Sequence, residues 1–276
     1  MTTGQTEHYL GAMLVSDDSF LRRLPVGLHP ENRLRMDAIV VASDIVSQCY
    51  QDLSRIGTEI GATLGQSGYP QRAAFIGLAW SIVDQLHAVR QLVTPPTGTP
   101  AGFATQRFLD AAEPATMLRN KMDHLKNNLS NLAAKKGERY PLFGAISYVL
   151  SNPDPQSGGL LMTVSSGALH GDDLFPAVNP AGRSYSTPVG LLQLNAFDLT
   201  FEFSSALAAL QDYLAITEVS TEKKMRAAAE AEAEKGVQTV EELMAHLGGS
   251  PVVAMAFDYT NDPVFEAETT AHTKSH

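Results

Sequence analysis

The stretch FIGLAWSIVDQLHAVRQLV, residues 75 to 93, decides the fold of this chain. Its large apolar residues recur on more than one side of an ideal helix, which is typical of a helix buried at the centre of a helical bundle. Asp84 and His87 depart from that pattern. Because a buried carboxylate needs a partner, we expect Asp84 to pair with a basic or polar group on a neighbouring helix, with Arg119 favoured.

Helical patterns flank this stretch on both sides. Pro30 suits a first helical turn, and from there apolar residues keep a helical period to about Gly65. The predicted stripe consists of Leu34, Ala38, Val41, Ile45, Cys49, Leu53, Ile56, Ile60 and Leu64. After the loop TPPTGTPAG, residues 94 to 102, a helical turn covers about 103 to 112 and a further helix runs from about Thr116 to Lys135.

That last helix contains MLRNKMDHLKNNLSNL, residues 117 to 132, which has two offset stripes. The apolar stripe, expected to face the core, consists of Leu118, Met122, Leu125, Leu129 and Leu132. A polar seam of Asn120, His124, Asn127 and Asn131 lies roughly 200° away around the helix. Such a seam is either a solvated face or a surface that addresses a partner or a substrate.

Arg119-Asn120-x3-His124 resembles the motif of the HEPN superfamily, which is an Arg, four to six residues and then a His, often with a polar residue directly after the Arg. Residues 75 to 93 resemble the helix that precedes this motif in such domains. The resemblance implies a helical bundle that is commonly dimeric and, in many members, a ribonuclease that needs no metal or other cofactor. It covers about half of the chain.

The resemblance also implies a role for each residue of the motif. His124 would act as general base on a 2′-hydroxyl or as general acid on the leaving 5′-oxygen. Arg119 would hold the phosphate, and Asn120 would position either Arg119 or His124. Asp84 and His87 would orient these residues without touching the substrate. Arg119 and His124 lie roughly 140° apart on an ideal helix, so a homodimer that joins two copies of the motif across one cleft is expected.

The second half of the chain has a different pattern. Three short apolar runs, at 141–150, 159–164 and 189–194, predict an antiparallel sheet, and Asp198 is expected to cap a long helix that starts at Leu199. Thr239-x-x-Glu242 predicts a capping box, and 251–257 predicts a strand. The predicted fold is mainly α (α+β), an antiparallel helical bundle with a small antiparallel sheet inserted at about 141–195, before the last long helix. The expected boundaries are an arm at 1–29, which includes a short helix or strand near Tyr9 to Val15, one domain at 30–260 and a loose tail at 261–276.

The absence of several motifs disfavours ordinary nucleotide-binding, hydrolase and metal enzymes. The sequence has no glycine-rich phosphate loop, no Gly-x-Ser-x-Gly and no His-Glu-x-x-His. Its eight His are scattered and Cys49 is its one Cys, so neither a zinc site nor an intramolecular disulfide is expected, and the His170–Asp173 segment is expected to be a polar loop tip. No apolar run reaches the roughly 18 residues of a membrane span and no secretory signal is recognisable, so a cytoplasmic location is the default expectation.

Charge restricts the expected partners. Residues 1–150 hold 14 basic and 13 acidic side chains, whereas residues 151–276 hold 6 and 17. A general nucleic-acid binder is basic, so RNA binding would depend on a local patch at 105–139, which holds seven basic and four acidic groups. Two other functions stay open. One is a catalytically inert helical module that dimerises or binds a partner through the seam, and the other is a small-molecule binding protein that uses the junction of sheet and bundle.

Overall fold

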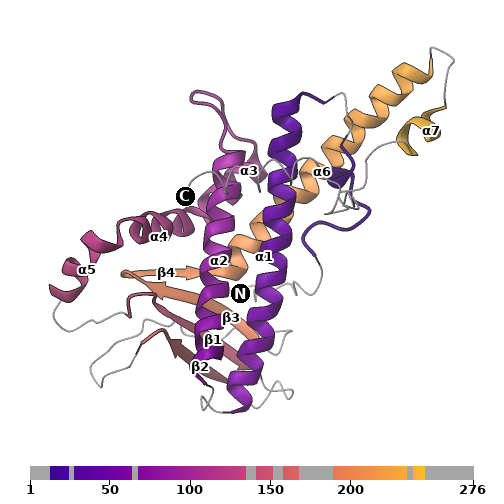
Figure 1. Ribbon diagram of the computed structural model, residues 1–276. Coiled ribbons are helices and arrows are strands. Elements are labelled where there is room, and N and C mark those ends of the chain that lie inside the picture. Colours follow the sequence, from indigo (N-terminus) through magenta and orange to yellow (C-terminus); the bar gives the residue numbers. More distant parts are fainter. Residues whose placement is uncertain are drawn as a thin grey trace, which may run out of the picture.

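The computed structural model describes residues 13–24, 28–63, 68–134, 141–151, 158–167, 189–234 and 239–245. Two long helices, α1 (Pro30–Ala62) and α2 (Tyr69–Val93), run antiparallel and side by side across one face of a small sheet (Figure 1). Both begin with a proline in their first turn, as the sequence predicts for Pro30. The fold is mainly α with a minor antiparallel sheet, so the predicted fold class is confirmed.

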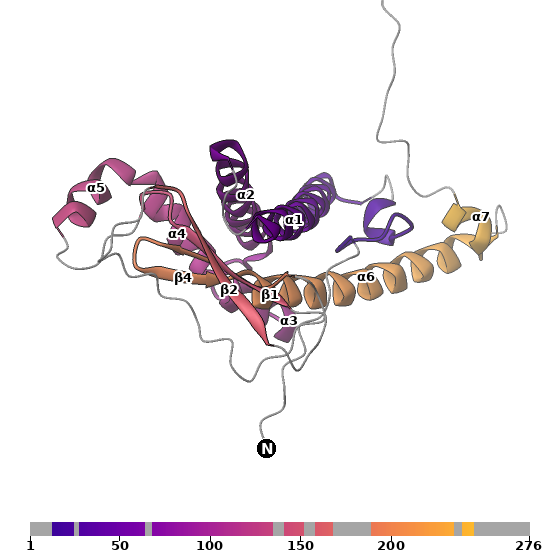
Figure 2. The ribbon, with the colours of Figure 1, turned by 90° about the horizontal axis from the view of Figure 1, so that it is seen from below.

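The remaining helices surround this pair. Their bounds are α3 (Phe103–Ala111), α4 (Glu113–Asp123), α5 (Leu125–Ala134), α6 (Phe203–Ala233) and α7 (Val240–Ala245). Helix α4 packs on α2, and α3 packs on α6, where the rings of Phe108 and Tyr213 stack with their centroids 6.1 Å apart. The far half of α6 extends beyond the sheet and carries α7 near its end (Figure 2).

The strands β1 (Ala145–Ser151), β2 (Gly159–Ser165), β3 (Val189–Ala196) and β4 (Leu199–Glu202) pair antiparallel in the order β2-β1-β3-β4. The first three match the apolar runs of the sequence. The expectation that a helix starts at Leu199 under an Asp198 cap is wrong, because Phe197 and Asp198 have φ values of 53° and 68° and turn the chain into β4. Positive φ at both central residues is what a tight type I′ hairpin turn requires. Helix α6 therefore begins at Phe203.

The hydrophobic core lies between α2, α1 and the sheet. Phe75 meets Tyr148 of β1 edge to face at 5.5 Å between ring centroids, and Trp80 meets Phe197 in the same way at 6.3 Å. The Tyr148 hydroxyl donates a hydrogen bond of 3.0 Å to the carbonyl of Gly57 on α1. The prediction that α2 is buried at the centre of the bundle is confirmed only in part, because Ala74, Gly77 and Asp84 are exposed on one side of the helix. Eight residues of α2 belong to the core: Phe75, Ile76, Ala79, Trp80, Ile82, Val83, Leu86 and Val89.

The predicted apolar stripe of α1 is right only in the second half of the helix. Cys49, Leu53, Ile56 and Ile60 are buried, whereas Leu34, Val41 and Ile45 are exposed. In the first half the core face includes Ser43 and Ser47, whose hydroxyls donate to the backbone carbonyls four residues earlier at 2.7 and 2.9 Å. Because the hydroxyls of these two serines have their hydrogen-bond partners within the helix, the serines can lie on the buried face. A pattern of hydrophobic residues alone therefore does not identify this face.

The N-terminal segment packs on α1. Leu14, Val15 and Leu21 belong to the same core, and the only regular element of residues 13–24 is a 3₁₀ turn at Phe20–Arg22. Arg22 binds Asp44 through two hydrogen bonds of 2.7 Å, and this carboxylate raises the pKa of the Arg22 guanidinium. For the expected element near Tyr9 to Val15, only residues 13–15 are described, and they form neither helix nor strand.

One further prediction about the C-terminal half, the capping box, is confirmed. Helix α6 runs on through the Ala- and Glu-rich segment to Ala233. Thr239 and Glu242 form the predicted capping box, with the backbone N–H of Thr239 donating to the Glu242 carboxylate at 2.8 Å and the N–H of Glu242 donating to the Thr239 hydroxyl at 3.2 Å. The predicted strand at 251–257, the tail at 261–276 and the His170–Asp173 loop lie outside the described residues.

Candidate functional site: a groove between α2, α4 and the sheet

Arg119 and Asp84 join α4 to α2. The Arg119 Nε lies 2.9 Å from an Asp84 carboxylate oxygen, and its Nη1 also binds Asp123 one turn further along α4. The predicted pairing of Asp84 with Arg119 is therefore found, although at the rim of the bundle. The Arg119 side chain is 34% exposed and that of Asp84 is 49% exposed. Two carboxylates hold the guanidinium in one orientation while solvent and ligands can still reach it.

His87 lies one helical turn after Asp84 and has a different neighbourhood. Its Nδ1 is 3.2 Å from the Thr116 hydroxyl, and its Nε2 is 2.9 Å from the Gln91 side-chain amide. In the described residues no hydrogen bond joins His87 to Arg119 or His124. The contact with Thr116 fastens α2 to the start of α4, so the structure gives His87 a place in the helix interface.

His124 interrupts the helix that the sequence predicts as continuous. Helix α4 ends at Asp123, His124 has φ −100° and ψ 28°, and α5 begins at Leu125. The Asn128 side-chain amide donates to the carbonyl of Lys121 at 2.7 Å and so satisfies an acceptor that the break leaves without its helical donor. The single helix expected from Thr116 to Lys135 is therefore wrong, and α5 departs from α2 (Figure 1).

The break changes the burial of the predicted apolar stripe. Leu118 is fully buried, Met122 and Leu125 are half-buried, and Leu129 is 52% exposed. The prediction that Leu129 faces the core is wrong because α5 has left the bundle. The side chain of Leu132 lies outside the described residues. The seam of Asn120, His124, Asn127 and Asn131 is exposed throughout, as predicted, but its first residue lies on α4 and its last two lie on α5.

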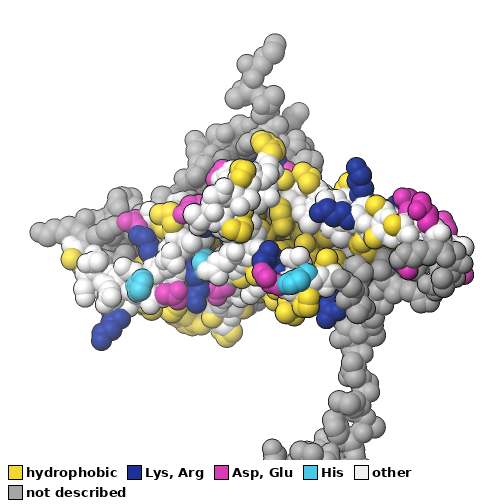
Figure 3. All heavy atoms as spheres, turned by 90° about the horizontal axis from the view of Figure 1, so that it is seen from above, with side chains coloured by type: hydrophobic (Ala, Val, Ile, Leu, Met, Phe, Trp, Pro, Cys, Tyr) yellow, Lys and Arg dark blue, Asp and Glu magenta, His cyan; other side chains and the backbone are white. Residues whose placement is uncertain are grey.

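The basic groups expected to form a patch are largely paired. Four of them are in the described residues, and three of these bind carboxylates: Arg107 binds Asp212, Arg119 binds Asp84 and Asp123, and Lys121 binds Asp198. The fourth, Lys126, is exposed. On the face seen in Figure 3, basic side chains are scattered and several lie beside acidic side chains. An interaction that depends on net positive charge therefore has little support in this part of the molecule.

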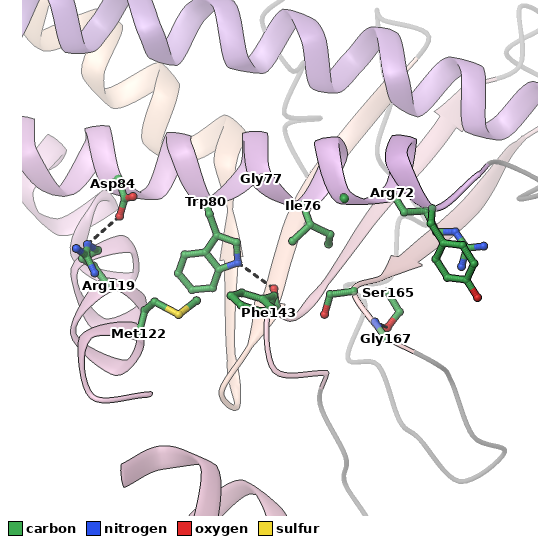
Figure 4. A pocket seen from close by; sticks show the side chains of 13 residues that line it. Arg72, Ile76, Gly77, Trp80, Asp84, Arg119, Met122, Phe143, Ser165 and Gly167 are labelled. Atoms are coloured by element: carbon green, nitrogen blue, oxygen red, sulfur yellow. Dashed lines mark hydrogen bonds and ion pairs between the residues drawn. The ribbon is translucent and has the colours of Figure 1, made fainter. Parts of the chain in front are cut away.

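A groove of about 680 Å³ extends along α2 from the Asp84–Arg119 pair towards the start of the helix. Figure 4 shows the labelled side chains of α2 and α4 converging on it with Phe143, which precedes β1. Residues 165–167, at the end of β2, form a further part of its wall. A concave, partly apolar site of this size is typical of small-ligand binding.

Trp80 and Phe143 form the centre of the groove. The indole Nε1–H donates a hydrogen bond of 2.9 Å to the backbone carbonyl of Phe143, which fixes both the ring and the segment before β1. Met122 of α4 lines the same region, and the side chain of Phe143 is 46% exposed. The groove therefore presents an aromatic, apolar centre beside the charged pair.

The other end of the groove is formed by the first turn of α2. The Arg72 guanidinium lies over the Tyr69 ring at 4.8 Å from its centroid, an arrangement stabilised by cation–π attraction. Among the lining residues that the structure describes, the charged side chains are Arg72, Arg119 and Asp84.

Sequence reasoning identified Asp84 and Arg119 but treated Trp80 as a core residue and did not single out Tyr69, Arg72 or Gly77. A signal was present, because Tyr69, Arg72, Ile76, Trp80 and Asp84 recur every three or four residues and so follow one face of a helix. The sequence alone does not distinguish this face of α2 from the core face, because the groove is formed only where α4 and the sheet pack beside the helix.

Two properties of the described residues concern other kinds of site. They contain no group of three or more His, Cys, Asp or Glu side chains that could hold a metal ion. None of their helices combines the length and apolarity needed to cross a membrane. Comparison of the chain with protein-family models, with curated proteins and with solved structures finds no match.

Proposed function

We propose that this protein is a HEPN-like, metal-independent endoribonuclease that acts as a homodimer. The observation that carries the proposal is the place of Arg119, which is held by Asp84 and Asp123 at the end of an aromatic groove, five residues before an exposed imidazole. A guanidinium held in this way is suited to a phosphate, because three of its five N–H groups lie outside the two ion pairs.

The proposed reaction is transfer of the phosphate within the RNA strand. The 2′-hydroxyl oxygen forms a bond to phosphorus while the bond from phosphorus to the 5′-oxygen breaks, which leaves a 2′,3′-cyclic phosphate and a free 5′-hydroxyl. His124 of one protomer accepts the proton of the 2′-hydroxyl, and a second His124 donates a proton to the leaving oxygen. Arg119 stabilises the charge that develops on the phosphate oxygens, and Asn120 positions Arg119 or His124.

A dimer is part of the proposal because one protomer does not bring these groups together. In the described residues no hydrogen bond joins the His124 side chain to Arg119, whose ion pairs point to Asp84 and Asp123. A two-fold axis beside α4 would place two exposed His124 side chains and two Arg119 side chains along one cleft.

The test is cleavage of a labelled single-stranded RNA by the purified full chain in the presence of EDTA. His124→Ala should lower the rate by about 10² to 10⁴, the usual effect of losing an acid or base, and Arg119→Ala by about 10² to 10³. His29→Ala and Arg226→Ala are matched controls, because both residues are exposed and Arg226 also forms an i,i+4 ion pair. Cleavage retained in His124→Ala, or lost on chelation, excludes this mechanism.

A second candidate function is a catalytically inert helical module that dimerises or binds a partner. The exposed residues Leu34, Val41 and Ile45 favour it, because they recur at the spacing of an apolar helix seam on α1. Light scattering together with the RNA cleavage assay separates the two candidates. If wild type dimerises without cleaving RNA and Val41→Glu is monomeric, the module is the better account; if the triple Ala variant of Asn120, His124 and Asn127 is monomeric instead, the seam is the interface.

A further inference from the structure

Gly77 has no packing reason to be a glycine. It lies inside α2 and lines the groove, and a Cβ added there would have no heavy atom within 4 Å. Glycine inside a helix costs about 1 kcal/mol relative to alanine. A close helix contact, the usual structural reason for accepting that cost, is therefore absent at this position. A larger side chain at position 77 would extend into the groove.

The walls beside this opening are aromatic and rigid. Ile76 and Trp80 flank Gly77 along α2, and Phe143 faces them with its carbonyl held by the Trp80 indole (Figure 4). Trp80 is fixed from two sides, because its ring also packs edge to face on Phe197. A surface fixed before binding loses little conformational freedom when a ligand arrives, which favours stacking of a flat ring.

Guanidinium groups lie near both ends of this apolar centre. Arg72 belongs to the first turn of α2, and Arg119 is paired with Asp84 three turns further on. Twelve residues of helix separate Arg72 from Asp84, which corresponds to about 18 Å along α2. A ligand that fits these features combines a flat ring at its centre with negative charges at some distance from the ring in both directions, as a segment of several nucleotides has within a single strand. A lipid with a single head group would use only one of the two arginines.

We infer that the groove binds single-stranded RNA, with one unpaired base stacked on the exposed ring of Phe143 beside Gly77, and with phosphates further along the strand in both directions towards Arg72 and Arg119. This inference deepens the proposed ribonuclease function and rests on it, since it names the substrate class and adds the residues that hold the strand. Base stacking on aromatic side chains and Arg contacts to phosphates are the usual elements of single-strand recognition.

The chain carries one tryptophan, and it lies in this groove, so Trp80 fluorescence reports directly on groove occupancy. The probe is a short oligoadenylate titrated into the full-length His124→Ala variant, which binds without cleaving. Saturable quenching is expected. The same oligonucleotide with abasic residues should bind more weakly by about fivefold or more, because a stacked base accounts for at least that factor.

Gly77→Leu tests the site itself, because its side chain extends into the open space and improves the helix propensity of α2. It should weaken oligoadenylate binding by about tenfold or more. Ala74→Leu adds the same bulk at an exposed position of α2 that does not line the groove, and it should bind as the His124→Ala parent does. Circular dichroism of both variants verifies that they are folded.

Three results would overturn the inference: equal affinity in Gly77→Leu, equal affinity for the abasic strand, or quenching by a long-chain carboxylate with none by RNA. These outcomes are distinguishable from failure of the proposed nuclease. If wild type binds RNA in the groove but cleaves none, the binding site stands and the nuclease does not. If wild type cleaves RNA and Gly77→Leu cleaves and binds equally well, the nuclease stands and the groove is not its binding site.

Discussion

Arg119 of α4 lies 2.9 Å from Asp84 of α2, and this ion pair connects the charged end of the groove to the central helix of the fold. The two residues are 35 positions apart in the chain and meet because α4 packs against α2. The side chains of Arg119 and Asp84 are 34% and 49% exposed, so the ion pair contributes more to the orientation of the guanidinium than to the stability of the fold.

Asp84→Ala should accordingly destabilise the protein only slightly. An ion pair with this exposure is typically worth about 0.2–1 kcal/mol, and Arg119 retains Asp123 as a partner. Urea unfolding of Asp84→Ala, Arg119→Ala and the double variant gives the coupling energy directly. A coupling above about 2 kcal/mol would mean that the pair is part of the folding core, and Arg119→Ala would then be unsuitable as a functional probe.

The two leucines at either side of the helix break should respond very differently to truncation. Leu118→Ala should cost roughly 2–5 kcal/mol of unfolding free energy, because Leu118 is fully buried on the core face of α4. Leu129→Ala should cost less than about 0.5 kcal/mol, because its side chain is exposed on α5. Chemical denaturation of both variants tests the break at His124, since a continuous helix with one apolar stripe would make the two costs similar.

Two glycines should respond oppositely to alanine. Gly144 has φ +80°, and a Cβ there would lie 2.6 Å from the carbonyl oxygen of Asn195 and 2.7 Å from the Cβ of Ala196, so Gly144→Ala must push β1 and β3 apart. Gly77→Ala meets no neighbour and should stabilise the protein by about 1 kcal/mol through helix propensity. Thermal unfolding should show a lower Tm for Gly144→Ala and a higher Tm for Gly77→Ala. Equal shifts would contradict the geometry of β1 and α2.

Alkaline pH should weaken the fold through Tyr148. Burial raises the pKa of Tyr148 to about 12, against about 10 for an exposed tyrosine. Because the folded-state pKa is the higher one, this contribution is fully present below pH 10 and is lost as the pH rises to about 12, with a total of roughly 3 kcal/mol.

Tyr148→Phe is the variant that isolates this effect. It removes the hydroxyl that donates to the Gly57 carbonyl, at a cost of about 1 kcal/mol at neutral pH. The variant should lose less stability than wild type when urea unfolding is compared at pH 9 and pH 11. An identical loss in both proteins would assign the alkaline sensitivity to other groups.

RNA binding in the groove should depend only weakly on salt. Two arginines at the ends of the site allow about two phosphate contacts, so the slope of log K against log salt should be close to −1.4, from roughly −0.7 per contact on single strands. Fluorescence titrations of the His124→Ala variant at several salt concentrations measure this slope. A value steeper than about −4 would place the main RNA contacts on a basic surface away from the groove.

The sequence by itself determined the architecture of this protein to a large extent. The all-round apolar pattern of residues 75–93 predicted a central helix, and short apolar runs bounded by turn residues predicted β1, β2 and β3. These features are local, because periodicity and turn chemistry depend on residues close together in the chain. The pairing of Asp84 with Arg119 was also predicted, but the reason for it, burial of the carboxylate, does not hold, because the Asp84 side chain is 49% exposed.

The tertiary structure decided what local pattern does not contain. The apolar stripe from Leu118 to Leu129 is continuous in sequence, but the helix is interrupted at His124. There the Asn128 side chain, in place of a backbone N–H, donates to the carbonyl of Lys121. The core face of α1 shifts onto Ser43 and Ser47 because the N-terminal segment packs there. The groove exists only because α4, Phe143 and the end of β2 converge on one face of α2. Cavities and packed faces are properties of distant segments brought together, and no single segment of the sequence specifies them.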